Sequence, residues 1–293
     1  MEELERAQTR LDHIRTVVPI LSALRTISLG SWQVSLKQRT SVQRYGERLT
    51  AMLWLLVPHL PAGQRARRVK SQEPGRIVAL VVGSERGLVG RFNVAVVDRA
   101  EQYLAEQEAV GAQVELVALG TRVRRIFQRR QRLLAWADTL SITGLPPYRL
   151  AFDLTRRWLA RYEQHELDAV DLVYNAYHGM GRYETTVARL IPPQLPKGQN
   201  SLSEPWPPPI IETDPLSLYA RVIEQWATVS LYGLLLDSAA AEHSMRYQLM
   251  ESATQNADRL IEELTLAVQA ARRHAITQEM QELAAGAGLI GPR

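Results

Sequence analysis

The sequence has no cysteine among its 293 residues, and only three of its 35 basic residues are lysines. Without cysteine the chain can form no disulfide framework, thiolate metal site or cysteine nucleophile. None of the lysines follows a glycine, which excludes a P-loop, because that motif places its lysine directly after a glycine. No apolar run approaches the roughly 20 residues that cross a bilayer. We therefore expect no direct membrane insertion and no ATP hydrolysis through a P-loop.

Other features of the composition exclude or disfavour further classes of function. The six histidines lack the spacing of metal ligands, so we expect no metal site. We also expect no cofactor. Basic residues gather at 65–70 and 122–132, but aromatic residues are not interleaved with them in the manner of a base-stacking surface. The net charge is only +4, so the sequence does not favour nucleic-acid binding. The acidic first residues carry no secretory or transit signal. We expect the protein to remain on the reducing side of a membrane.

Both ends of the sequence have the apolar spacing of long helices. From residue 2 to about 57 the apolar residues recur on one face, and Pro19 predicts a kink that costs about 3 kcal/mol in a helix interior. Residues 215–290 are almost all helix formers. Their narrow apolar seam consists of Met245, Leu249, Ala253, Ala257, Leu260, Leu264, Ala267 and Ala271. Such a seam suits close helix packing, so we predict that the two ends pair as a long antiparallel coiled coil.

The middle of the sequence has the pattern of an α/β domain. Continuous apolar runs at 77–82 and 114–119 predict strands buried in a parallel sheet, and 171–177 and 185–191 are further strand candidates. Helical stretches alternate with these runs, which predicts a Rossmann-like three-layer domain inserted between the terminal helices. The predicted domain boundaries are a discontinuous coiled-coil shaft at 1–62 and 213–293, an α/β domain at 75–195 and a proline-rich linker at 196–212.

A glycine-rich turn after the first predicted strand raises the alternative of a nucleotide-binding α/β enzyme. Gly83, Gly87 and Gly90 have the spacing G-x3-G-x2-G, whereas the dinucleotide fingerprint is G-x-G-x-x-G. The second predicted strand ends at Gly120 without an acid that could bind a ribose hydroxyl. The turn therefore favours close backbone packing over cofactor binding. A free-standing coiled-coil adaptor is a second alternative, because it needs the apolar seam and no further motif.

The C-terminal part of the sequence carries a specific resemblance. Residues 241–250, 253–257 and 271–280, followed by Gly286 and Ala287, closely resemble the C-terminal helix of the gamma subunit of F-type ATP synthases. That family reads S-E-x-x-A-R-M-x-A-M-x-x-A-T-x-N-A, then R-Q-x-x-I-T-x-E, then G-A. The likeness to this family is strongest in these segments.

Other pieces of the same family pattern occur in the same order. Residues 84–93 are similar to the family's S-D-R-G-L-C-G-G-F-N loop, and residues 20–28 align loosely with I-T-K-A-M-K-M-V-A. Leu24 and Arg25 stand where the family has Met-Lys, and Arg273 stands where it has Gln. The resemblance covers nearly the whole chain and indicates a divergent branch, with an alternative ion-translocating ATPase as one interpretation.

The resemblance implies a non-catalytic central-stalk rotor, which transmits torque between a membrane ion-driven ring and a catalytic hexamer in ATP synthesis. The implied partners are an alpha/beta-type hexamer, an epsilon-type small stalk subunit and a membrane c-type ring. The implied location is the cytoplasmic face of a membrane, expected to be a bacterial inner membrane, with peripheral attachment. The implied partner contacts are Leu24, Arg25, Arg272, Arg273, Thr277, Glu279, Leu289 and Ile290, and the implied loop near the rotor base contains Arg86, Gly87, Gly90 and Asn93.

Overall fold

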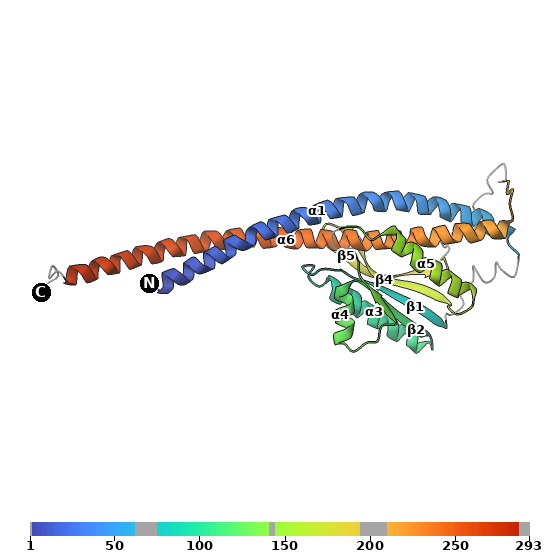
Figure 1. Ribbon diagram of the computed structural model, residues 1–293, viewed down its shortest axis with the longest axis horizontal. Helices are drawn as coiled ribbons and strands as arrows, with labels where there is room; N and C mark the ends of the chain where they lie inside the picture. The colour runs from blue at the N-terminus through green and yellow to red at the C-terminus, as the bar shows by residue number, and fades with distance from the viewer. Residues whose placement is uncertain (1, 62–74, 141–143, 194–209, 287–293) are drawn as a thin grey trace. The chain divides into compact units, whose positions relative to one another are not determined.

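The computed structural model describes residues 2–61, 75–140, 144–193 and 210–286. Its two longest elements are α1 (Glu2–Leu56) and α6 (Pro215–Gly286). A 3-10 helix, η1 (Val57–His59), follows α1 directly, and the described residues between 75 and 193 form strands and shorter helices. This order confirms the predicted fold class, a mixed α/β domain inserted between long terminal helices (Figure 1).

The strands form one sheet in the order β3-β2-β1-β4-β5. Its parallel part consists of β1 (Arg76–Val82), β2 (Gln113–Leu119), β3 (Trp136–Asp138) and β4 (Ala169–Gly179), and β5 (Arg182–Ile191) pairs antiparallel with β4. In β1 every residue after the first is buried. This burial on both faces explains why the strand has an uninterrupted apolar sequence.

Different helices cover the two faces of the sheet (Figure 1). On one face, α3 (Phe92–Ala109) and α4 (Thr121–Arg129) contribute Val96, Val97 and Phe127 to the core. On the other face lie α5 (Tyr148–Glu163) and part of α6. The α6 residues in that core are Leu231, Tyr232, Leu235 and Leu236. The C-terminal helix is therefore built into the core of the α/β domain.

The contacts divide the chain into two compact units, the first of which is Leu29–Arg246. Within it, the second half of α1 runs antiparallel to the first half of α6, because contacts at higher positions in α1 meet lower positions in α6. Nε of Arg39 lies 2.8 Å from Oδ1 of Asp237, whereas the indole of Trp226 donates a 3.0 Å hydrogen bond to Thr50, further along α1. An apolar cluster closes this hairpin and contains Leu49, Leu53, Leu56, Leu60, Tyr219, Val222 and Val229.

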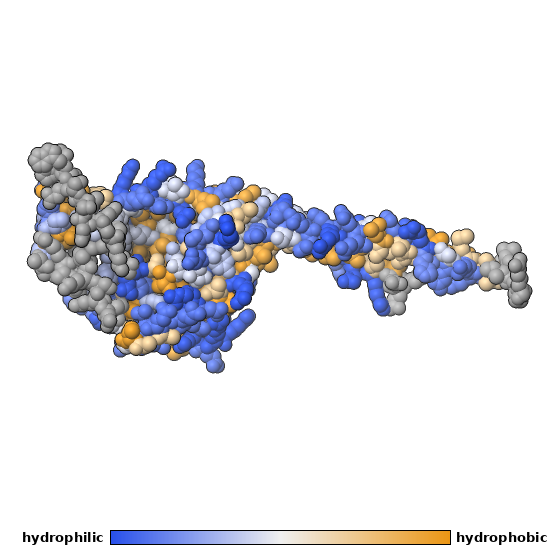
Figure 2. Space-filling view, turned by 180° about the vertical axis from the view of Figure 1, so that it is seen from behind, coloured by the Kyte–Doolittle hydropathy of each residue, from blue (hydrophilic) through white to orange (hydrophobic). Residues whose placement is uncertain are grey.

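The second unit joins Met1–Ser28 to Tyr247–Arg293. In its described part, Leu11 and Ser28 are buried on α1, and Met250, Thr254 and Ala257 are buried on α6. The spacing of the three α6 residues places them on one narrow face, as expected for a helix with a single neighbouring helix. Hydrophobic residues also remain at the surface of this helical part (Figure 2), among them Ile276, Met280 and Leu283.

Some details agree with the sequence-based expectation and others differ from it. The helix α1 continues through Pro19 to Leu56, in agreement with the predicted helix, and the kink at Pro19 remains a prediction. Of the predicted α6 seam, Ala257 is buried but Leu260 is 41% exposed, while Met250 and Thr254, outside that seam, are buried. The short strand β3 was not predicted. The predicted domain boundaries assign the terminal helices and the α/β domain to separate domains, and these boundaries remain a prediction.

Candidate functional site

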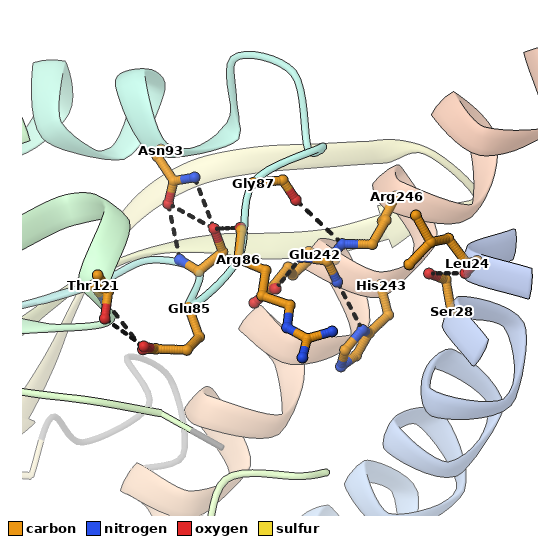
Figure 3. Close-up of polar contacts among 12 residues, drawn as sticks. Leu24, Ser28, Glu85, Arg86, Gly87, Asn93, Thr121, Glu242, His243 and Arg246 are labelled. Atoms are coloured by element: carbon orange, nitrogen blue, oxygen red, sulfur yellow. Dashed lines mark hydrogen bonds and ion pairs between the residues drawn. The ribbon is translucent and has the colours of Figure 1, made fainter. Parts of the chain in front are cut away.

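The loop between β1 and α3 is fixed by its own polar groups. The backbone N–H of Ser84 donates to Oδ1 of Asn93 over 2.8 Å, and Nδ2 of Asn93 donates to the Ser84 hydroxyl over 2.8 Å (Figure 3). The same hydroxyl lies 2.6 Å from the carbonyl oxygen of Arg86. Asn175 on β4 then holds the start of α3 through a 2.9 Å bond to the carbonyl of Phe92. Asn93 is thus a structural residue that closes the loop.

The loop glycines serve close packing. A Cβ atom added to Gly83 would lie 1.8 Å from Cγ2 of Val123, and one added to Gly87 would lie 3.2 Å from the Arg122 guanidinium. Gly90 has φ +56°, a left-handed conformation that glycine adopts without strain. Leu88 also has a positive φ, of +62°, and its side chain is exposed. Arg86 is exposed beside it.

The N-terminus of α4 already has an anionic partner. The Glu85 carboxylate accepts hydrogen bonds from the Thr121 hydroxyl, from the Thr121 N–H over 3.1 Å and from the Leu140 N–H over 3.1 Å. Burial alone would raise the pKa of Glu85, but these bonds outweigh burial and lower it. A helix N-terminus that follows a parallel strand is a common anion site, and here a side chain of the chain itself fills it.

Side chains of α6 complete the site from the opposite side. The Arg246 guanidinium lies 3.4 Å from the carbonyl of Gly87, 2.5 Å from Oε1 of Glu242 and 3.2 Å from Nδ1 of His243 (Figure 3). Burial raises the pKa of Glu242, and Arg246 partly offsets this rise. Burial and the nearby Arg246 charge lower the pKa of His243 to about 4. His243 is therefore neutral at pH 7, which lets Nδ1 accept from Arg246.

The loop and α6 also share an apolar contact. Val89 and Phe92 are buried with Ala241 of α6, and Tyr177 and Tyr183 pack around them. The loop predicted from the sequence is therefore anchored to α6 by both polar and apolar contacts. Sequence reasoning did not assign Glu85, Glu242 or Arg246 to the site. The spacing of Glu242 and Arg246, four residues apart on a helix, was the signal that could have identified their pair.

The predicted contacts on the terminal helices lie in the second unit. Leu24 is half-buried, and its carbonyl accepts a 2.7 Å bond from Ser28. Arg25 pairs with Glu251 of α6 at 2.7 Å. The remaining described residues of this group are all exposed, and they are Arg272, Arg273, Thr277 and Glu279. Leu289 and Ile290 lie outside the described residues.

A large cavity lies beside α1 within the unit Leu29–Arg246. Its volume is about 770 Å³, and Trp54, Trp226 and Tyr174 provide aromatic walls. Arg39 and Asp237 contribute charges at its lining. Across the described ranges, no three histidine or acidic side chains gather where they could hold a metal ion. The same ranges contain no helix with the length and apolar character required to cross a bilayer.

Comparison with known proteins gives a consistent result. The family model described as ATP synthase matches residues 3–288. The chain is 26% identical over 290 residues to the ATP synthase gamma chain of Solibacter usitatus, covering 98% of this chain and 99% of that one. It is 27% identical over 290 residues to the ATP synthase gamma chain of Pelotomaculum thermopropionicum, covering 99% and 100% of the two chains.

Solved structures share the fold. A chain in the Euglena gracilis mitochondrial ATP synthase, in a structure of OSCP, F1 and c-ring, superposes with a TM-score of 0.64 at 15% identity, over 99% of this chain and 97% of that one. A chain in the central stalk and c-ring structure of the Tetrahymena thermophila mitochondrial ATP synthase gives a TM-score of 0.59 at 16% identity, over 80% and 99%. At these identities the likeness establishes the fold.

Proposed function

The chain belongs to the gamma family of ATP synthases, and we propose that it transmits torque as the central-stalk rotor of an F-type enzyme without catalysing a reaction itself. One observation carries this proposal. The helix α6 supplies Leu231 and Leu235 to the core of the α/β domain and continues without a break to Gly286. A rotor needs such a stiff connection, because torque applied to a domain reaches a distant helix only through an element that does not yield.

The geometry of the glycine loop supports a non-catalytic role. Its polar groups bind one another, and the carboxylate of Glu85 occupies the N-terminus of α4. A nucleotide phosphate would have to displace Glu85 from that N-terminus and would also find Gly83 packed against Val123. These contacts favour a loop that fastens the α/β domain to α6, and they do not favour the alternative of a nucleotide-binding enzyme.

We propose three partners. The exposed α6 residues Arg272, Arg273, Thr277 and Glu279 suit contacts with polar loops of an alpha/beta-type hexamer, and the α/β domain suits attachment to a c-type ring. The solved structures that share this fold belong to assemblies containing F1 or a c-ring, which supports these two partners. As the third partner we propose an epsilon-type small stalk subunit, with the concave surface and aromatic walls beside α1 as its candidate contact.

The same role sets the proposed location and domain boundaries. We propose a peripheral position on the cytoplasmic face of a bacterial inner membrane, held there by the ring. We also propose the functional division into a shaft at 1–62 and 213–293, an α/β domain at 75–195 and a linker at 196–212. Of the linker, only 210–212 belong to the described residues.

Purification from native membranes distinguishes the candidate functions. A rotor should copurify with a large nucleotide-binding hexamer, which partner identification by mass spectrometry would reveal. A monomer that binds NAD or ATP by itself would support an enzyme. A parallel homodimer formed through the long helices would support a free-standing adaptor.

Replacing Arg272 by alanine should weaken rotary catalysis while leaving the fold of the chain unchanged. The side chain is exposed, so its loss removes no core contact. Loss of one contact of about 1 kcal/mol at an interface should reduce the ATPase rate or the yield of the assembled complex roughly fivefold. Arg156 on α5 is also exposed and provides the matched Arg156→Ala control. Equal ATPase rates and assembly yields for the two variants would argue against a hexamer contact at Arg272.

A further inference from the structure

Four residues bring α1, α6 and β4 together at one point of the unit Leu29–Arg246. Trp32 and Arg39 lie on α1, Asp237 lies on α6 and Tyr177 lies on β4; we call this group the α1–α6–β4 joint. Nε of Arg39 lies 2.8 Å from Oδ1 of Asp237. The other oxygen of Asp237 accepts the backbone N–H of Tyr177 over 3.4 Å. The rings of Trp32 and Tyr177 are tilted against each other with centroids 6.2 Å apart.

The charge at this joint is buried. The Asp237 side chain is only 8% exposed, and Arg39 is about one-third exposed. Burial raises the pKa of Asp237, and Arg39, the Tyr177 N–H and His178 each act to lower it. Burial and the Asp237 charge together raise the pKa of Tyr174, a neighbour on β4, to about 12. A buried ion pair of this kind contributes little net stability, because desolvation offsets most of the attraction.

A buried ion pair that adds little stability can still fix the relative positions of the elements it joins. The packing of α6 and α1 on the sheet shows why such positioning matters here. The helix α6 packs on the sheet through four buried apolar residues. Along α1, in contrast, the cavity of about 770 Å³ lies between the residues from Arg39 to Trp54 and those of β5. Trp32 and Arg39 are seven positions apart and therefore lie on the same face of α1. They contact β4 and α6 where the cavity begins.

From this arrangement we propose that the α1–α6–β4 joint passes torque between α1 and the α/β domain. Asp237 is the positioning residue, because its two oxygens contact α1 through Arg39 and β4 through Tyr177. Trp32 and Tyr177 restrict sliding of α1 along the sheet. Through the joint, both terminal helices rotate together with the α/β domain. The helix α1 therefore keeps its position on the domain while α6 transmits the torque. This inference rests on the proposed rotor function.

The test uses the whole complex reconstituted in vesicles, with the number of ions taken up per ATP hydrolysed as the readout. Both proton and sodium uptake are followed. The variant Arg39→Gln/Asp237→Asn removes the charges of the joint. The matched control Arg161→Gln/Glu115→Gln removes another ion pair between elements, of 2.7 Å, which joins α5 to β2 and touches neither α1 nor α6. Unfolding curves of both chains show whether their stability is equal.

The expected result is at least a twofold loss of ions per ATP in the joint variant and an unchanged ratio in the control. Equal numbers of ions per ATP in the two variants would contradict the proposal that the joint passes torque. If Arg39→Gln/Asp237→Asn does not fold, the single variant Arg39→Gln replaces it in the test, because a buried Asp237 without its partner can take up a proton. The variant Arg39→Lys should then restore part of the lost ions per ATP. A wild-type complex without ATP-driven uptake would contradict the rotor function itself, which is a separate outcome.

Discussion

Replacing Asp171 by alanine should lower the free energy of unfolding of the chain by about 3–5 kcal/mol, because removing one partner of a buried pair leaves the other charge uncompensated. Asp171 is buried on β4. Arg189 on β5 donates two hydrogen bonds of 2.7 Å to its carboxylate, and the hydroxyl of Tyr103 on α3 also donates to it. Urea denaturation followed by tryptophan fluorescence measures the change.

The control for this prediction is an exposed pair of the same chemistry. Arg130 contacts Asp98 at 2.7 Å, and both side chains are at least one-third exposed. Surface pairs contribute about 0–1 kcal/mol, so Asp98→Ala should have a small effect. In the double variant Asp171→Leu/Arg189→Met both charges are absent, and most of the stability should return. A loss below about 1 kcal/mol for Asp171→Ala would show that the contacts of Asp171 with Arg189 and Tyr103 do not stabilise the fold.

Replacing Gly83 by alanine should lower the free energy of unfolding by about 3 kcal/mol, which is the upper part of the usual range for overpacking. The added Cβ would lie 1.8 Å from Cγ2 of Val123 and 2.8 Å from Oδ1 of Asn93. Both neighbours are buried, so the backbone between β1 and α3 would have to move. Thermal unfolding should show a fall in Tm of roughly 6–12 °C.

At Gly30 the same substitution should raise the free energy of unfolding instead of lowering it. An added Cβ there has no heavy atom within 4 Å, and the residue lies inside α1. Gly30→Ala should therefore stabilise the helix by about 0.5–1 kcal/mol. The double variant Gly83→Ala/Val123→Ala removes the clashing methyl. Its loss in free energy of unfolding should therefore be smaller than the sum of the losses of the two single variants. Strict additivity in that pair would show that the clash is not the cause.

The sequence predicts those elements best whose burial leaves a periodic or continuous pattern. The run at 77–82 becomes the central strand β1, since a strand covered on both faces needs apolar residues at every position. The strand β3 has only three half-buried residues, Trp136–Asp138, which is too short for any period. Pro19 lies inside the single helix α1, and the kink expected there remains a prediction.

The candidate site is harder to predict because its contacts join residues far apart in the sequence. The loop at 84–93 is recognisable from its glycines, but nothing local indicates that Arg246 reaches the carbonyl of Gly87. Arg39 and Asp237 are likewise separated by most of the chain, and no periodicity connects them. Such contacts depend on how the sheet and the helices pack, which only the folded chain specifies.

Direct observation of rotation tests the rotor account. The catalytic hexamer with this chain bound is fixed to a surface, and a bead is attached to the chain through a single cysteine introduced at Arg99 on α3, which is possible because the sequence has no other cysteine. The account predicts that ATP drives continuous rotation of the bead in one direction. A hexamer that hydrolyses ATP while the bead stays fixed on the bound chain would contradict it.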